Sequence, residues 1–190
     1  MLTRFSFAVI ATFAIFFMGC EEKKVAIAAD TGFELRLLGG DVLKARVDPS
    51  EGRYNNLVLN AGEKPALYVF FTTVCPECAK EIPHIIDMKN HYKDSVNIVG
   101  VLVENKNAKE VADFVEKNGI NYPVAIGAGA FRLADAVGGV RLIPAIHIYD
   151  GKGKYVSHFV GPAPQEMLET RLNPLLGIAN TASTVRAKTE

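Results

Sequence analysis

The protein has 190 residues, of which 49% are hydrophobic, and its 21 basic side chains balance 21 acidic ones. This length fits one domain of ordinary size with a real hydrophobic core. The neutral balance provides no basic surface for phosphate groups, so we expect no nucleic-acid partner.

The N-terminal segment is typical of an export signal. Arg4 gives it a positive start, and the apolar run that follows is too short to span a bilayer comfortably. The run ends in Phe17-Met18-Gly19-Cys20, which resembles a bacterial lipobox, in which the Cys becomes the lipidated first residue. We therefore predict a signal peptide at residues 1–19, lipidation of Cys20 and a polar tether at residues 20–31. An ordinary secretory signal or an N-terminal membrane anchor is the alternative.

The first elements of the mature chain are predicted to be strands. A Gly-rich turn at residues 39–41 separates residues 33–38 from residues 42–47, which predicts a hairpin. A loop is expected at residues 48–56 because proline and glycine interrupt it. Residues 66–71 form a short apolar and aromatic run, as expected for a strand that is buried on both faces.

The rest of the chain alternates between helices and strands. The predicted helices lie at residues 76–92, 108–118, 130–137 and 165–176, and the predicted strands at residues 96–103, 145–149 and 155–160. Alternating strands and helices imply parallel pairing, and the terminal hairpins add antiparallel strands. We therefore predict an α/β fold with a central mixed β-sheet flanked by helices, in one domain at residues 32–177 with a flexible tail at residues 178–190.

Two cysteines stand where the buried strand gives way to the first helix. They are Cys75 and Cys78, separated by Pro76 and one glutamate. Pro76 suits the first helical position because its missing N–H would have no partner there. Cys75 then becomes the N-cap, where unpaired N–H groups and the helix dipole stabilise a thiolate. We predict that Cys75 is the exposed, attacking sulfur and that Cys78 resolves the mixed disulfide.

Other uses of a pair of cysteines three residues apart fit the sequence less well. A zinc site needs about four ligands, and the chain has no second cysteine pair near its scattered histidines. Haem attachment needs a histidine directly after the second cysteine, where Ala79 stands. A purely structural disulfide would not need the start of a helix. The pattern favours redox chemistry carried by the disulfide itself, with no cofactor and no metal.

Several motifs resemble those of thioredoxin-fold proteins, in particular the membrane-tethered branch typified by TlpA, ResA and CcmG. The resemblance is carried by residues 68–78 and by Glu81-Ile82-Pro83. Leu142-Ile143-Pro144 resembles the loop that holds the family's cis-proline, and residues 150–153 match the turn between its last two strands. Residues 96–118 resemble the βα insertion of this branch. The resemblance implies a thioredoxin-like fold with an N-terminal β-hairpin and a central βα insertion.

The resemblance also implies roles for three further residues. Ile143, before a cis Pro144, would offer its backbone to an extended client as one added strand. Glu81 would lie beneath the disulfide and carry the proton of Cys78, and burial would raise its pKa towards neutrality. The simpler alternatives are a trans proline at the start of an edge strand and a solvated glutamate. His84 could join the network of Glu81, although we expect a plain surface histidine.

The predicted function is reduction of protein disulfides by an extracytoplasmic, membrane-anchored lipoprotein of the bacterial periplasm. No flavin or dinucleotide fingerprint is present, so electrons would come from a membrane-embedded thiol donor of the CcdA or DsbD type. The expected clients are proteins with oxidised cysteine pairs, of which apocytochrome c is the family's best-known case.

Two other functions would use the same cysteines. A peroxiredoxin-like thiol peroxidase would use Cys75, but Tyr68 stands where that family has a proline. A copper or other metal chaperone would use both thiols, but it usually needs a wider spacing and a dedicated histidine. Val74 and Val69 replace the tryptophan and the polar residue that are common in the resembling family, which leaves substrate preference open.

Overall fold

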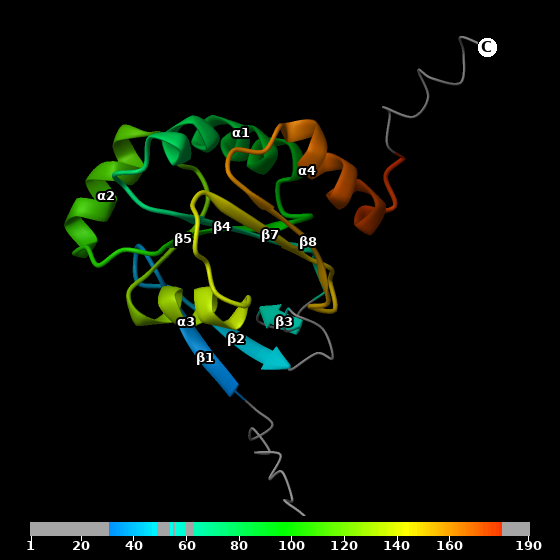
Figure 1. Cartoon of the computed structure of the whole chain (residues 1–190), viewed down its shortest axis with the longest axis horizontal. Coiled ribbons are helices and arrows are strands. Elements are labelled where there is room, and N and C mark those ends of the chain that lie inside the picture. The colour runs from blue at the N-terminus through cyan, green and yellow to red at the C-terminus, as the bar shows by residue number, and fades with distance from the viewer. Residues whose placement is uncertain (1–30, 49–53, 55, 60–62, 180–190) are drawn as a thin grey trace, which may run out of the picture.

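The computed structural model describes residues 31–48, 54, 56–59 and 63–179. The predicted signal peptide, the lipidation site Cys20 and nearly all of the tether and tail lie outside these residues. Eight strands form one sheet in the order β3-β2-β1-β6-β5-β4-β7-β8, with helices on both faces (Figure 1). The strands are Thr31–Leu37 (β1), Val42–Asp48 (β2), Asn56–Leu59 (β3), Ala66–Phe71 (β4), Asn97–Leu102 (β5), Val124–Ile126 (β6), Ala145–Tyr149 (β7) and Tyr155–Val160 (β8).

The middle of the sheet consists of strands that are buried on both faces. All six residues of β4 are buried, because an unbroken apolar run leaves no position that must meet water. β4 pairs in parallel with β5 and antiparallel with β7, so the sheet is mixed, as predicted. The carboxyl ends of β4 and β5 therefore leave the same edge of the sheet, and the first of them leads to Cys75.

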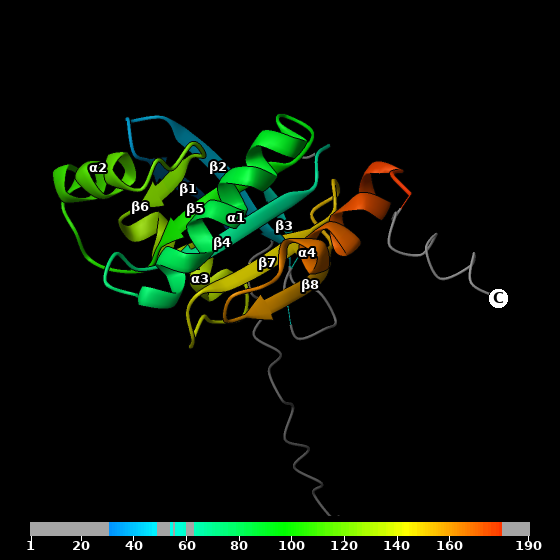
Figure 2. The same cartoon turned by 90° about the horizontal axis from the view of Figure 1, so that it is seen from above.

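Helices cover the two faces of the sheet unequally. The helices are Pro76–Tyr92 (α1), Ala108–Lys117 (α2), Ala128–Ala136 (α3) and Gln165–Leu172 (α4), with a 3-10 helix at Asn173–Leu176 (η1). α1, α2 and α4 pack on one face, whereas α3 packs on the other (Figures 1 and 2). Ile85, Val111 and Leu168 accordingly belong to one hydrophobic cluster, and Leu35 and Leu133 belong to a second cluster across the sheet.

The N-terminal hairpin is confirmed and has a third strand. Gly39 and Gly40 adopt φ angles of 103° and 101°, which favour glycine, and so allow the tight turn between β1 and β2. β3 pairs antiparallel with β2. It begins at Asn56, the last residue of the predicted loop. The strand β6 was also not predicted. It pairs with both β1 and β5, and thereby joins the hairpin to the central sheet.

Most other predicted elements have the bounds that the sequence indicates. β4, β7, β8 and α1 coincide with their predicted ranges, and α2 and α3 differ by one or two residues. The predicted final helix instead divides into α4 and η1. Pro174 lies at this division, because a proline has no N–H to continue the α-helical hydrogen bonds.

Among the acidic and basic side chains of the described residues, two are buried in the interior. Glu81 of α1 is 1% exposed and His147 of β7 is 4% exposed. His147 packs edge-on against Phe70, with ring centroids 5.5 Å apart. Burial of a charged group costs free energy unless the group is neutralised or has polar partners. Within the same described ranges, no helix is both long and apolar enough to cross a membrane.

Candidate active site

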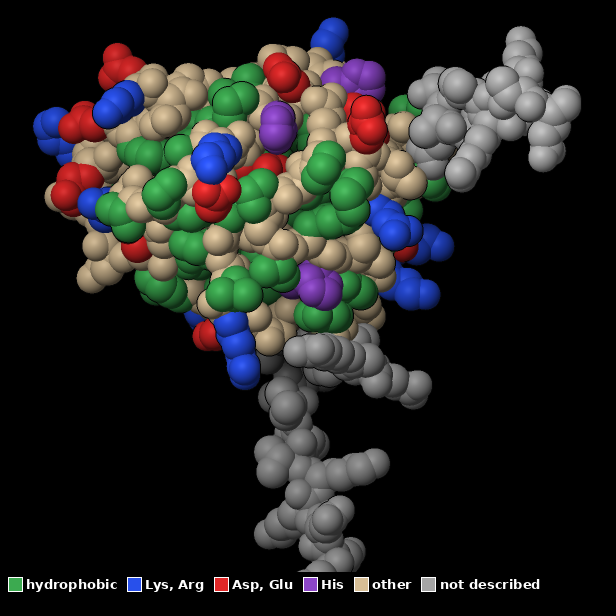
Figure 3. All heavy atoms as spheres, turned by 45° about the horizontal axis from the view of Figure 1, so that its top comes forward, with side chains coloured by type: hydrophobic (Ala, Val, Ile, Leu, Met, Phe, Trp, Pro, Cys, Tyr) green, Lys and Arg blue, Asp and Glu red, His purple; other side chains and the backbone are tan. Residues whose placement is uncertain are grey.

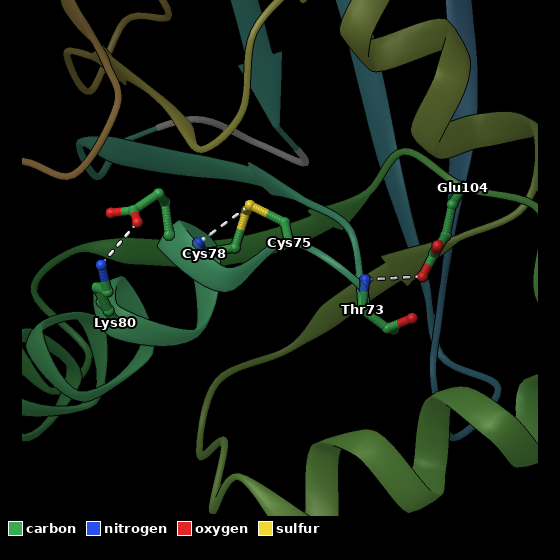
Figure 4. Close-up of a disulfide and its surroundings, with 6 residues drawn as sticks. Thr73, Cys75, Cys78, Lys80 and Glu104 are labelled. Atoms are coloured by element: carbon green, nitrogen blue, oxygen red, sulfur yellow. Dashed lines mark hydrogen bonds and ion pairs between the residues drawn. A yellow bond between two sulfur atoms is a disulfide. The ribbon is translucent and has the colours of Figure 1, made fainter.

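Cys75 and Cys78 form a disulfide at the start of α1 (Figure 4). Cys75 is the N-cap residue, with an extended backbone at φ −89° and ψ 111°, and Pro76 follows as the first helical residue. The sulfur of Cys75 accepts a hydrogen bond from the N–H of Cys78 at 3.1 Å. Such N–H groups have no partner inside the helix. The contact that caps the helix therefore also stabilises negative charge on the Cys75 sulfur once the disulfide opens.

The two cysteines are unequally accessible. Cys78 is only 2% exposed and packs in the hydrophobic cluster beneath α1. Cys75 is half-buried, and Val74 before it is 76% exposed. Thiol–disulfide exchange requires direct access of one sulfur to another, so an outside molecule reaches Cys75 and not Cys78. This difference is what the predicted attacking and resolving roles require.

A carboxylate holds the loop that leads to the disulfide. The N–H of Thr73 donates a hydrogen bond of 2.8 Å to Oε1 of Glu104 (Figure 4). Glu104 follows β5, whose carboxyl end lies beside that of β4 because the two strands are parallel. Glu104 was not among the predicted site residues. Its position just beyond the second of two parallel strands was the available signal, since loops at that edge of a sheet meet.

The exposed side of the first helical turn carries an ion pair. Lys80 and Glu77 approach within 2.6 Å, and both side chains are more than half exposed. In Figure 4, Lys80 lies on α1 near the disulfide, with a dashed line to the carboxylate with which it pairs. Exposed pairs of this kind contribute little to stability, about 0–1 kcal/mol. The pair gives the surface next to the sulfurs a balanced charge.

Glu81 lies beneath the disulfide end of α1, three residues after Cys78 on the same buried face of the helix. Its Oε2 accepts a hydrogen bond from the backbone N–H of Ala163 at 3.1 Å. Its Oε1 is buried and accepts no hydrogen bond from any described residue. Burial raises the pKa of this carboxyl above the usual 4.5, although the Ala163 N–H and His84 offset part of the effect. The predicted burial is confirmed, and the pKa shift has the predicted direction.

His84 is the exposed helix histidine that we expected, and its ring also contacts Glu81. Its Nδ1 lies 3.6 Å from Oε2 of Glu81, while 47% of its side chain is exposed. The histidine therefore connects the buried carboxyl with the surface of the protein. The spacing of three residues on one helix was the signal for this contact.

The loop before β7 contains the predicted cis peptide bond, between Ile143 and Pro144. The carbonyl of Pro144 accepts a hydrogen bond from the N–H of Gly161 at 2.8 Å, which ties the loop to the end of β8. Ile143 and Cys75 both pack against the hydrophobic cluster beneath α1, and Leu142 is 67% exposed. Presentation of a client by the backbone of Ile143 stays a prediction.

The histidines of the sheet do not form a metal site. His147 and His158 stack with ring centroids 5.2 Å apart. The neighbouring groups are phenols, since Tyr155 and Tyr54 hydrogen-bond the two ring nitrogens of His158. Across the described parts of the chain, no three His, Cys, Asp or Glu side chains are grouped to hold a metal ion.

Comparison with known proteins identifies relatives that carry out disulfide exchange. ResA, a thiol-disulfide oxidoreductase of Halalkalibacterium halodurans, is 32% identical over 103 residues, which are 53% of this chain and 56% of ResA. HelX, a thiol:disulfide interchange protein of Rhodobacter capsulatus, is 27% identical over 146 residues, which are 74% of this chain and 77% of HelX. The alignment thus spans little more than half of the length of this ResA.

Solved structures show the same fold. StoA from Bacillus subtilis superposes with a TM-score of 0.56 at 20% identity, over 73% of this chain and 94% of StoA. A thioredoxin-family thiol:disulfide interchange protein from Chlorobium tepidum gives a TM-score of 0.59 at 24% identity, over 77% of this chain and 94% of that protein. The predicted thioredoxin-like fold is confirmed. The sequence pattern described as Redoxin matches residues 47–174, and the chain belongs to this family.

Proposed function

We propose that this protein is an extracytoplasmic thiol-disulfide oxidoreductase that reduces protein disulfides with Cys75 and Cys78. One observation carries the proposal. The disulfide joins a reachable sulfur at a helix N-terminus to a buried sulfur one turn further along. ResA and HelX, whose names describe disulfide chemistry, support the same assignment. Neither a peroxidase nor a metal chaperone gains support from these relatives.

The reaction needs only the two thiols and a proton acceptor. In the reduced protein, the Cys75 thiolate attacks one sulfur of a client disulfide, which forms a mixed disulfide and releases one client thiolate. Cys78 then loses its proton and attacks Cys75, which releases the second client thiolate. The client gains two electrons, the cysteine pair loses two, and the pair closes as the observed disulfide.

Glu81 is the proposed acceptor of the proton of Cys78. A thiolate is costly in the apolar surroundings of Cys78, so the proton must leave as the new sulfur–sulfur bond forms. Glu81 lies on the same buried face of α1, and its raised pKa brings it closer to the range that suits general acid–base catalysis. Its Oε1, which no described residue hydrogen-bonds, is free to take the proton.

Clients are proposed to bind across exposed apolar residues at the edge of the sheet where β4 leads to Cys75. Val74 and Leu142 are 76% and 67% exposed, and Val160 at the end of β8 is 55% exposed. An extended client segment would pair with the backbone of Ile143 beside these residues. Figure 3 shows one face of the protein, on which apolar side chains are exposed between charged ones.

The proposed setting is a membrane surface outside the cytoplasm. Lipidation of Cys20 would hold the domain there, and a membrane-embedded thiol donor of the CcdA or DsbD type would return electrons to the disulfide. Apocytochrome c is the client that we propose to test first. The sequence around Cys20 supports this setting.

Trapping of the mixed disulfide tests the function. Cys78→Ser leaves Cys75 able to attack but removes the resolving sulfur, so clients stay linked to it. The matched control Cys75→Ser should retain none. Linked proteins with cysteine pairs, released by dithiothreitol, are the expected result. Equal yields from both variants would refute the assignment, and a reduction potential near that of DsbA, about −120 mV, would refute a reductase.

A further inference from the structure

The resolving reaction leaves a proton in a closed part of the molecule. Cys78 and Glu81 are only 2% and 1% exposed, so neither exchanges a proton directly with water. A carboxyl that keeps the proton cannot serve in the next turnover. The proton therefore needs a second titratable group that touches Glu81 and reaches the surface.

His84 meets both conditions. Its Nδ1 lies 3.6 Å from Oε2 of Glu81, and 47% of its side chain is exposed. It lines a surface pocket of about 630 Å³ between α1 and the beginning of α4, together with residues 162–166 and Glu169. One side of the imidazole ring thus faces the buried carboxyl, whereas the residue also borders space that is accessible to water.

The other ionisable groups around this contact do not provide an alternative exit. Tyr122 is 6% exposed, and burial followed by the charge of Glu81 raises its pKa above the usual 10, so it stays a neutral phenol. Glu166 and Glu169 of α4 line the same pocket as His84.

We propose that His84 relays the proton of Glu81 to the pocket. This inference rests on the proposed function. Cys78 gives its proton to Oε1 of Glu81 as its sulfur attacks Cys75. A half-turn of the carboxyl group then brings the protonated oxygen to Nδ1 of His84, which takes this proton. The resulting imidazolium releases a proton from Nε2 to water, which restores the carboxylate and a neutral imidazole. His84 acts through Glu81 and does not touch the reacting sulfurs, so it is a positioning and relay residue.

A two-step thiol assay separates attack from resolution. The reduced protein reacts with dithiobis-nitrobenzoate, whose coloured thiolate is released once by Cys75 and a second time when Cys78 resolves the mixed disulfide. His84→Gln keeps a polar side chain but cannot carry a proton. His91→Gln is the matched control, because His91 is another exposed histidine of α1.

His84→Gln should leave the first release unchanged and slow the second on the order of 10-fold at neutral pH, less than the about 10²-fold lost with a direct general base. Added imidazole should restore the second release in His84→Gln and leave His91→Gln unaffected. An unchanged second release, or a slow one that imidazole does not restore, would overturn the relay. Failure of the unaltered protein to give two releases would instead refute the proposed function.

Discussion

His147 should make the folded protein less stable in mild acid. Its ring is 4% exposed, and it lies in β7 opposite Tyr68 of β4 and His158 of β8. Burial, and then the charge of His158, lower its pKa from 6.5 to about 4. The unfolded chain therefore binds a proton at a pH where the folded protein does not. The contribution of neutral His147 to the stability of the folded protein is complete above the unfolded pKa of 6.5. It is lost as the pH falls towards 4.

The size of the effect follows from the two pKa values. A shift from 6.5 to about 4 corresponds to about 3 kcal/mol when fully expressed, and to about 2 kcal/mol between pH 7 and pH 5. His147→Leu removes the titration at similar volume, whereas His91→Gln removes an exposed histidine of α1 instead.

Urea unfolding of the oxidised protein at pH 7 and pH 5 measures the effect. The free energy of unfolding of the unaltered protein and of His91→Gln should fall by about 2 kcal/mol more than that of His147→Leu. Glu81 is present in all three proteins, so its contribution to the pH dependence of the unfolding free energy cancels when they are compared. A parallel fall in all three would show that burial of His147 does not displace its pKa.

Four further substitutions, at three positions, test the site and its surroundings. Glu81→Gln removes the proposed proton acceptor, so the second release of the two-step thiol assay should slow by about 10²-fold with the first unchanged; equal slowing of both would contradict this role. Gly129→Ala forces a Cβ against the carbonyl oxygen of Glu34, so α3 and β1 must separate. Its unfolding free energy should fall by about 1–3 kcal/mol, and an unchanged urea midpoint would refute the close approach. Glu104→Ala deprives the Thr73 N–H of its 2.8 Å partner and should cost about 1–3 kcal/mol, whereas Glu104→Gln keeps an acceptor and should cost less. Equal losses in the two Glu104 variants, measured by urea unfolding, would show that the hydrogen bond is not the cause.

The elements that carry the chemistry could be predicted because their signals are local. β4 is an unbroken apolar run, and α1 begins with an N-cap and a proline at its first position. These two features also locate Cys75 and Cys78. By contrast, β3 and β6 have four and three residues, which are too few to show a period. Both form because strands distant in the sequence offer them hydrogen bonds.

The same distinction separates the site residues. Glu81 could be predicted from its spacing to Cys78 and from the resemblance, and its burial agrees. Glu104 could not be predicted from its neighbours, because its contact with Thr73 exists only where β4 and β5 lie side by side. His84 stands between these cases, since the spacing allowed its contact but gave no reason to prefer it over solvent.

The pairing of β1 with β6 has a consequence for the order of folding. It joins Arg36 and Leu37 to Ile126 and Ala125, which lie in the other half of the chain. Closing such a long loop costs more entropy than pairing β4 with β5 through α1. We therefore expect the edge of β1 to stay unpaired until the central βα units have formed. Pulsed hydrogen exchange during refolding should protect the amides of β4 and β5 before those of β1, and the reverse order would exclude this sequence of events. During synthesis the hairpin emerges before β6, so its open edge is exposed to premature association with other chains.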